Sequence, residues 1–324
     1  MGKRRIRNLR ALGVEALAGF DPRADRRAEA VEKYAITAHS DFASAVEEFR
    51  PGALVISTPP DRHMDYAWQG SERGISCFIE ASVVDAERIL ELHRRTEGTS
   101  VLMAPSCTMR YYPGPKKVAE LVRAGVIGKP LNINYQIGQY LPDWHPWENI
   151  ADFYVSTRAT GGCREIVPFE LTWLNHLFGE PEPLACVKTK LTDMNADIDD
   201  IYHALLRYPA GVLANITVEV ISRPHATRQL RILGSDGEIV FNADENCVRY
   251  ANTSNPEWQR FDLAAGVVET GYINPEEPYI EEMRLFLSAL TQRDKSIFPH
   301  SLRDDYRVLQ VLYRLEALAA VSTR

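Results

Sequence analysis

Short apolar segments alternate with segments of helical period over the first hundred residues of this chain. The helical period occurs at residues 25–34, 41–49 and 62–73, and continuous apolar runs at 53–57 and 76–79 alternate with these segments. Parallel β-strands are joined by crossover helices and are buried on both faces, so their side chains are apolar throughout. The alternation therefore predicts an α/β unit, a parallel sheet flanked by helices.

The pattern changes after Pro105, where strict alternation of apolar and polar residues replaces the continuous apolar runs. Strands are expected there at residues 131–137, 212–221, 228–233 and 238–242. A period of two is typical of antiparallel strands with one buried and one polar face. We therefore expect two domains, an α/β domain at residues 1–105 and an α+β domain with a mostly antiparallel open sheet at residues 106–324.

Composition excludes several classes of protein. Hydrophobic residues make up 45% of the 324 residues and charged residues 25%, the mixture of an ordinary globular chain of about two domains. No apolar run approaches the roughly 20 residues of a membrane helix, and the net charge of −7 argues against a nucleic-acid partner. The 5 cysteines form no C-x-x-C pair, so we expect reduced thiols, a cytoplasmic protein and no metal site.

The N-terminus lacks a complete G-x-G-x-x-G fingerprint but contains what fits its last part. Gly2 opens a helical segment, a strand-like run at 14–20 follows, and Asp21 stands about twenty residues after Gly2, the spacing of the acid that bonds an adenosine ribose. Lys3 and Arg4 lie in the first helical turn, where they either approach a bound phosphate or form a solvated basic face. We expect a Rossmann-type domain whose first strand precedes residue 1, and greater stability for a chain extended upstream.

Further cofactor-binding candidates follow the central apolar strand. Ser57, Thr58, Pro59 and His63 lie where its carboxyl end is expected, and open α/β sheets bind ligands at that edge. The simpler alternative is a proline-terminated turn that leads into the next helix.

The residues after the first strand bear on the choice of cofactor. Asp21 favours a free ribose hydroxyl and therefore NAD, whereas Arg23, Arg26 and Arg27 could accept the 2′-phosphate of NADP. The sequence allows NAD or NADP, and we favour NAD slightly.

Four motifs occur in a characteristic order along the chain. They are Ser57-Thr58-Pro59-Pro60-Asp61-Arg62-His63, Met109-Arg110-Tyr111-Tyr112-Pro113, Gly125-Val126-Ile127-Gly128-Lys129-Pro130 and Gly234-Ser235-Asp236-Gly237. Together they resemble the Gfo/Idh/MocA family of oxidoreductases over almost the whole chain. The resemblance implies a Rossmann domain, a second domain with a large open sheet, NAD(P), a sugar-like substrate and a homodimer or homotetramer. It also places Glu80 beside the cofactor.

The chain departs from this family at the residues that handle protons. Ala81 stands where the family's E-K-P motif has Lys, and Phe169 stands where a later D-x-G-x-H motif has His. Oxidation of an alcohol needs a group that accepts the hydroxyl proton, and neither side chain can do so. A catalytically degenerate nucleotide-binding or structural homologue is therefore the alternative hypothesis.

Three residues are candidates to replace the missing groups. Glu165 keeps a carboxylate at the family's Asp position and could act in proton transfer. The alternative is a structural salt bridge with Arg164 or Arg158. Arg110 could bind a substrate carboxylate or phosphate. His145 lies in the aromatic loop 140–148 and could act as a base, unless that loop only packs against the sheet or a partner subunit.

Overall fold

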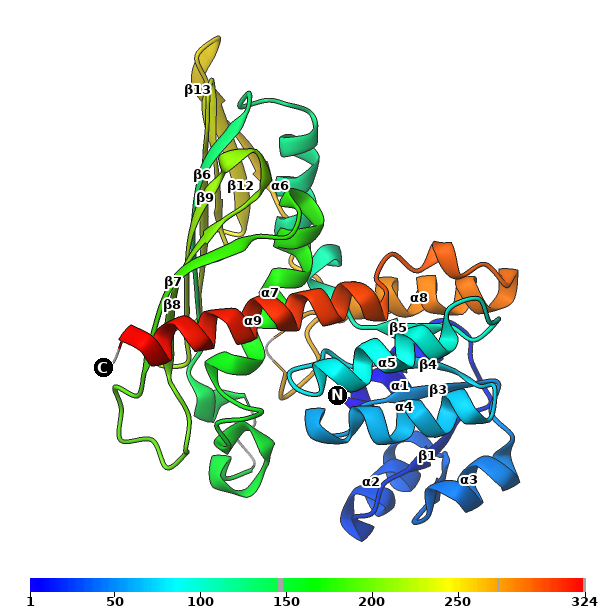
Figure 1. Ribbon diagram of the computed structural model, residues 1–324. Coiled ribbons are helices and arrows are strands. Elements are labelled where there is room, and N and C mark those ends of the chain that lie inside the picture. Colours follow the sequence, from blue (N-terminus) through cyan, green and yellow to red (C-terminus); the bar gives the residue numbers. More distant parts are fainter. Residues whose placement is uncertain (145–147, 273, 323–324) are drawn as a thin grey trace.

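The computed structural model describes residues 1–144, 148–272 and 274–322 (Figure 1). A helix-rich N-terminal unit lies beside a unit built on a large sheet. The long helix α9 (Leu302–Ser322) begins near the N-terminal unit and runs to the β7–β8 side of the large sheet. Within the described part of the chain, no helix is both long and apolar enough to cross a bilayer.

The N-terminal unit contains parallel strands, as the alternation predicts. β1 (Ala18–Phe20) pairs with β2 (Thr37–His39), and β3 (Ala53–Ile56), β4 (Ser76–Ile79) and β5 (Met103–Pro105) form a separate parallel sheet in that order. The flanking helices are α1 (Gly2–Ala11), α2 (Ala24–Tyr34), α3 (Phe42–Phe49), α4 (His63–Glu72) and α5 (Ala86–Thr96).

The first strand is shorter than the run at 14–20 suggests. The Val14 amide donates to the Leu9 carbonyl at 3.0 Å, and Arg10 Nη1 donates to the Glu15 carbonyl at 2.7 Å. These bonds hold the chain against the end of α1, so the strand begins only at Ala18. The strand expected before residue 1 is not tested and stays a prediction.

The second unit contains an eight-stranded sheet in the order β13-β12-β11-β10-β6-β9-β8-β7. Its strands are β6 (Pro130–Gly138), β7 (Glu182–Thr189), β8 (Ile201–Arg207), β9 (Leu213–Glu219), β10 (Thr227–Gly234), β11 (Gly237–Asn242), β12 (Cys247–Asn252) and β13 (Asn255–Asp262). Only β6 and β9 pair in parallel. The predicted mostly antiparallel open sheet is therefore confirmed.

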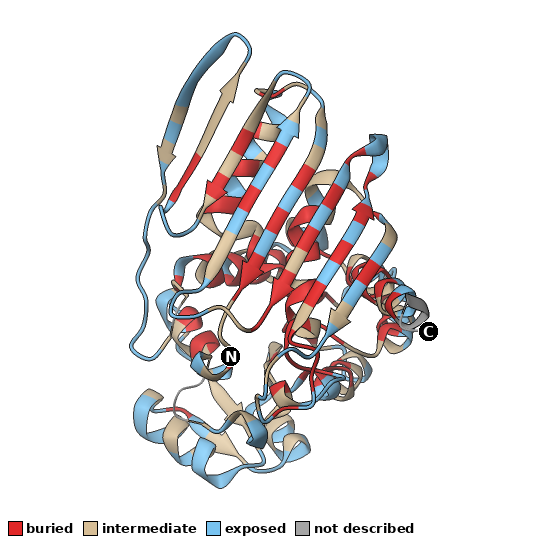
Figure 2. Cartoon of the chain, turned by 90° about the vertical axis from the view of Figure 1, so that its left-hand side faces the viewer, coloured by how far each residue is buried: buried red, intermediate tan, exposed pale blue. Residues whose placement is uncertain are grey.

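One face of this sheet is covered and the other is open. Helices α6 (Pro113–Arg123) and α7 (Cys163–Phe178) lie on the covered face, and alternate strand residues are buried and exposed (Figure 2). In β9, Ala214, Ile216 and Val218 are buried. Their period of two places the intervening residues on the open face.

The C-terminal segment returns to the N-terminal unit and locks the two units together. Phe286 of α8 (Glu277–Gln292) and Phe298 pack edge-on against Phe78 of β4, with ring centroids 5.7 and 6.2 Å away. Helix α9 then packs against α5, α7 and β7. Each unit therefore depends on the other for part of its core.

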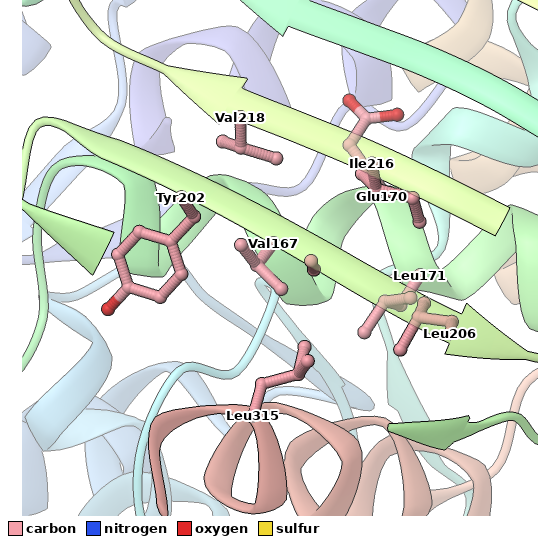
Figure 3. Close-up of a pocket in the computed structure, with 9 residues that line it drawn as sticks. Val167, Glu170, Leu171, Tyr202, Leu206, Ile216, Val218 and Leu315 are labelled. Atoms are coloured by element: carbon pink, nitrogen blue, oxygen red, sulfur yellow. The ribbon is translucent and has the colours of Figure 1, made fainter. Parts of the chain in front are cut away.

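The interior leaves little empty space. A cavity of about 10 Å³ lies between α7, α9 and the sheet, lined by apolar groups of Val167, Tyr202, Ile216 and Leu315 among others (Figure 3). This volume holds one water molecule at most. The cavity is a packing defect of the core rather than a ligand site.

Candidate cofactor and substrate site

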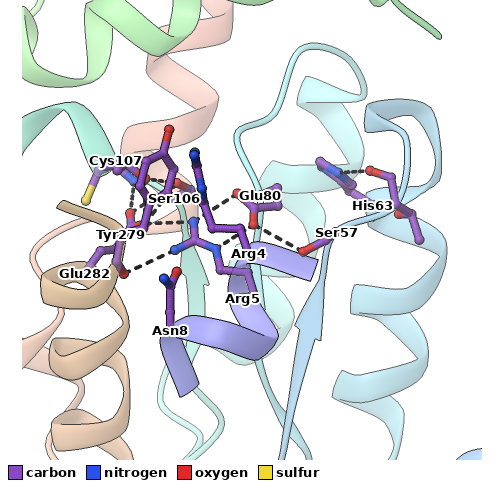
Figure 4. A network of polar contacts seen from close by, with 12 residues as sticks. Arg4, Arg5, Asn8, Ser57, His63, Glu80, Ser106, Cys107, Tyr279 and Glu282 are labelled. Carbon is purple, nitrogen blue, oxygen red and sulfur yellow. Dashed lines mark hydrogen bonds and ion pairs between the residues drawn. The ribbon is translucent and has the colours of Figure 1, made fainter. Parts of the chain in front are cut away.

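The carboxyl ends of β3 and β4 meet the start of α1. Ser57 follows β3, and its hydroxyl donates to Glu80 Oε1 at 3.2 Å, directly after β4. A Cβ atom added to Gly2 would lie 3.8 Å from Cβ of Ser57. Three of the expected cofactor-binding residues, Gly2, Ser57 and Glu80, therefore lie together. Figure 4 shows Ser57 and Glu80.

Glu80 is held as a fixed negative charge. Arg5 donates through Nε and Nη2 to the two Glu80 carboxylate oxygens, at 2.7 and 3.0 Å. Burial alone would raise the pKa of Glu80, but the Arg5 guanidinium outweighs it and holds that pKa below its ordinary value. Arg5 Nη2 also donates to Glu282 of α8 at 3.0 Å, so one buried guanidinium ties α1 to two acidic residues.

Glu282 in turn fixes the end of β5. It is fully buried and accepts hydrogen bonds from the Cys107 amide at 2.5 Å, the Thr108 hydroxyl at 2.6 Å and the Ser106 hydroxyl at 3.1 Å. The pattern of α8 alone gives no sign of this role, because its partners lie more than 170 residues away.

Lys3 and Arg4 are turned towards protein groups rather than towards an open phosphate site. Arg4 Nε donates to Glu276 Oε1 at 2.9 Å, and its guanidinium lies 4.1 Å from the centre of the Tyr279 ring. Lys3 Nζ lies 3.0 Å from Glu29 of α2. Arg7 Nη2 also donates to Glu276 Oε1 at 2.9 Å, so this one carboxylate is shared by two arginines. Phosphate binding by Lys3 and Arg4 stays a prediction.

Three buried polar atoms after β3 and β4 lack partners among the described residues: Thr58 Oγ1, His63 Nδ1 and Ser82 Oγ. His63 is 2% exposed, and its Nε2 lies 2.8 Å from the Thr58 carbonyl oxygen. A carbonyl only accepts, so Nε2 carries the proton and Nδ1 is left as an acceptor. Burial lowers the pKa of His63, so the ring is neutral near pH 7. Unpaired buried polar atoms are rare, and these three fit the hydroxyl and amide groups of a dinucleotide.

Pro59 contributes through the backbone. Its carbonyl accepts from the Arg62 amide at 2.9 Å, which closes the turn that leads from β3 into α4. The proline-terminated turn is therefore present, and it is the turn that carries Thr58 and His63.

Glu165 lies in the first turn of α7 and is paired with a tyrosine. Its Oε1 accepts a hydrogen bond of 2.9 Å from the Tyr154 hydroxyl, whereas Oε2 is buried without a partner in the described structure. Burial raises the pKa of Glu165 to about 7, and the bond from Tyr154 moderates this rise. A carboxyl that titrates near neutrality with a free oxygen is suited to proton transfer.

The arginine alternative for Glu165 is not what the structure shows. Arg164 Nε donates to Glu316 at 2.7 Å and its Nη1 to the Val83 carbonyl at 2.8 Å. Arg158 instead pairs with two aspartates after the β7 strand. The Arg164–Val83 bond also places the start of α7 beside the segment that follows Glu80.

Arg110 bonds to groups of this chain that come from two different helical regions. Its guanidinium donates to the Thr172 carbonyl at 3.1 Å and the Pro299 carbonyl at 2.8 Å, and lies 2.8 Å from His300 Nδ1. These three acceptors use its donors to join α7 to the start of α9. Arg110 therefore supports the packing of these two helices, and its role in binding a substrate anion stays a prediction. The third catalytic candidate, His145, lies outside the described residues.

Asp21 directly follows β1, as a ribose ligand would. Its Oδ1 accepts from the Arg23 amide at 2.8 Å, which fixes the turn into α2. Its carboxylate remains about one-third exposed.

The fold is α/β, and polar side chains gather at the carboxyl edge of the parallel sheet β3-β4-β5. Residues 116–240 match the family model described as the GFO/IDH/MocA C-terminal domain. This segment of the chain is therefore similar to that domain.

The chain is also similar to known oxidoreductases. Over 207 residues the chain is 22% identical to an uncharacterized oxidoreductase of Synechocystis sp., covering 59% of this chain and 55% of that relative. The chain thus spans about half the length of this curated relative. Levoglucosan dehydrogenase, solved with NADH and levoglucosan, superposes with a TM-score of 0.84 at 16% identity, covering 99% and 95% of the two chains. An oxidoreductase from Agrobacterium radiobacter, solved with NAD+, L-tartaric acid and magnesium, superposes with a TM-score of 0.84 at 12% identity. The superposition covers 98% of this chain and 94% of that chain.

Proposed function

We propose that this protein is an NAD(P)-dependent oxidoreductase that transfers a hydride from a hydroxyl-bearing carbon of a sugar-like substrate. The observation that carries the proposal is Glu165, a buried carboxyl with one free oxygen beside the nucleotide-type edge of the sheet. The two structural neighbours described above were solved with levoglucosan and L-tartaric acid, both rich in hydroxyl groups. They support a polyhydroxylated substrate here.

The unpaired atoms described above suit a nicotinamide dinucleotide. Thr58, His63 and Ser82 would hold its polar groups, and the start of α1 at Gly2 would face its phosphates. When bound, the cofactor supplies a hydride acceptor. NAD is the form we favour, because Asp21 can accept a hydrogen bond from a free ribose hydroxyl.

Glu165 replaces the proton-handling groups that the chain lacks at Ala81 and Phe169. In alcohol oxidation, Glu165 Oε2 accepts the hydroxyl proton, while Tyr154 keeps its hydrogen bond to Oε1 and fixes the carboxylate. In the reverse direction, protonated Glu165 returns that proton to the carbonyl oxygen.

The pH dependence of turnover should follow the ionisation of the Glu165 carboxyl. Because the base must be ionised, we expect kcat/KM for alcohol oxidation to rise with pH through about 7, and the rate of carbonyl reduction to fall over the same range. Tyr154→Phe should move both transitions to higher pH, since the Tyr154 hydroxyl bond lowers the pKa of Glu165. A profile that stays unchanged in Tyr154→Phe would contradict this role.

The same carboxyl affects folding. Its folded-state pKa of about 7 exceeds the ordinary value of 4.5, so its contribution to stability is full below the ordinary value and is lost as pH rises through about 7. Glu165→Gln should remove this part of the pH dependence, as measured by urea unfolding across that window.

The open sheet face supports a homodimer or homotetramer. Leu205 and Leu213 lie on it and are 47% and 46% exposed, and apolar groups on one face favour burial by a second copy. The five cysteines are all free and buried, which supports a reducing, cytoplasmic location.

A degenerate homologue is the second candidate, favoured by Ala81 and Phe169. The two candidates differ in turnover rather than in binding. A panel of anhydrosugars, cyclic polyols and hydroxy acids, tested with NAD+ by the absorbance of NADH, should contain a substrate if the first is correct. Tight NADH binding with no turnover on any of these would favour the second.

A further inference from the structure

The turn after β1 holds three arginines whose donors are directed to this chain's own acceptors. Arg23 donates through Nε and Nη2 to the two carboxylate oxygens of Asp25, at 3.1 and 2.6 Å. This fork lowers the pKa of Asp25 to about 2. Arg27 Nη1 donates to the carbonyls of Asp21 and Pro22, at 2.8 and 2.9 Å. Neither guanidinium is poised as an open phosphate fork.

The remaining contacts come from the other domain. Glu148 lies in the loop after β6, yet its Oε1 is 3.4 Å from Arg23 Nη1 and 3.7 Å from Arg26 Nη2. Arg26 Nη1 is 3.9 Å from Asp21 Oδ2. Arg26 is therefore placed between two carboxylates that come from opposite domains.

Burial distinguishes Glu148 from the other charges of this turn. The Glu148 side chain is 19% exposed, compared with 50% for Arg23 and 44% for Arg26. Electrostatic interactions strengthen as water is excluded, so Glu148 is the carboxylate that solvent screens least. With Asp21 and Asp25 it provides three negative charges against the three arginines, which leaves no net positive charge for an added anion.

We propose that Glu148 makes this site select NAD(H) against NADP(H). It occupies the Arg23–Arg26 pair that would otherwise bind the 2′-phosphate, and it repels that phosphate by like charge. The 2′-hydroxyl of NAD needs no cation and finds an acceptor in Asp21. The inference rests on the proposed function, since it concerns the cofactor of the same site. It assigns cofactor choice in part to the second domain.

The test is the affinity for NADPH and NADH, measured by calorimetry on wild type, Glu148→Gln and Glu148→Lys. We expect Glu148→Gln to tighten NADPH binding by about threefold or more, and Glu148→Lys to tighten it further, with NADH affinity changed by less than about twofold. Asp152→Asn, an exposed acid in the same region, is the matched control and should leave both affinities unchanged. Melting curves confirm that each variant is folded.

The outcomes separate the two proposals. If NADH binds and Glu148→Gln and Glu148→Lys leave NADPH affinity unchanged, Glu148 does not select the cofactor and the proposed function stands. If wild type prefers NADPH to NADH, the selectivity is the reverse of that proposed, and the inference fails. If wild type binds neither dinucleotide, the proposed function fails and this inference falls with it.

Discussion

Replacing Glu165 by glutamine should lower kcat for alcohol oxidation by about 10²–10⁴-fold. The amide keeps the size of the side chain and still accepts from Tyr154 at Oε1, but it cannot take a proton. NADH affinity should change by less than about twofold, because the loss lies in the transition state rather than in cofactor binding. Steady-state kinetics with the substrate found in the screen, together with NADH titration, measure both quantities.

The matched control is Glu180→Gln, which removes a half-exposed carboxylate that pairs with Arg314 at 3.2 Å on the surface. It should leave kcat unchanged. A kcat for Glu165→Gln within about threefold of wild type would exclude this carboxyl as the acid–base group.

Removing the charge of Arg5 should give the largest loss of stability. Arg5 is 1% exposed and pairs with Glu80 and Glu282, both at least nine-tenths buried. Breaking a buried pair leaves an uncompensated charge, so Arg5→Ala should lower the free energy of unfolding by about 3–5 kcal/mol. Urea unfolding with a tryptophan fluorescence readout measures this loss.

Arg10 provides the control within the same helix. Its guanidinium is exposed and donates to backbone carbonyls, so Arg10→Ala should cost about 0.5 kcal/mol or less. Equal losses for Arg5→Ala and Arg10→Ala would show that the buried network contributes nothing particular to the fold.

The sequence predicts the architecture well because hydrophobic period reports burial directly. Continuous apolar runs at 53–57 and 76–79 become strands of a parallel sheet, and the alternating run at 131–137 becomes a strand of the open sheet. The run at 14–20 is overestimated, since contacts with α1 hold Val14 and Glu15 outside the strand. The hydrophobic period of the sequence does not show that contacts with α1 compete with strand pairing.

The site is predicted less completely because its polar partners are distant in sequence. Ser57 and His63 are predicted from their place after one strand, and Glu80 is predicted from the family resemblance. Sheet topology brings Ser57 and Glu80 together. The contacts of Arg110 could not be predicted, because its acceptors lie 62 to 190 residues further along the chain.

Tyr154 is not identified from the sequence. It lies in a three-residue 3₁₀ turn without a period, and nothing in its local sequence announces a bond to Glu165. The one clue in the sequence is that Tyr154 carries a hydroxyl group in the irregular segment just before α7.

NADH binding tests the central claim most directly. Calorimetric titration of the purified protein should show saturable binding of NADH and weaker binding of NADPH. Thr58→Val and Ser82→Ala should each weaken the binding of NADH, because these substitutions remove the unpaired buried hydroxyls that we assign to the cofactor. Binding of neither NADH nor NADPH would contradict the account, and would leave those groups without the ligand we assign to them.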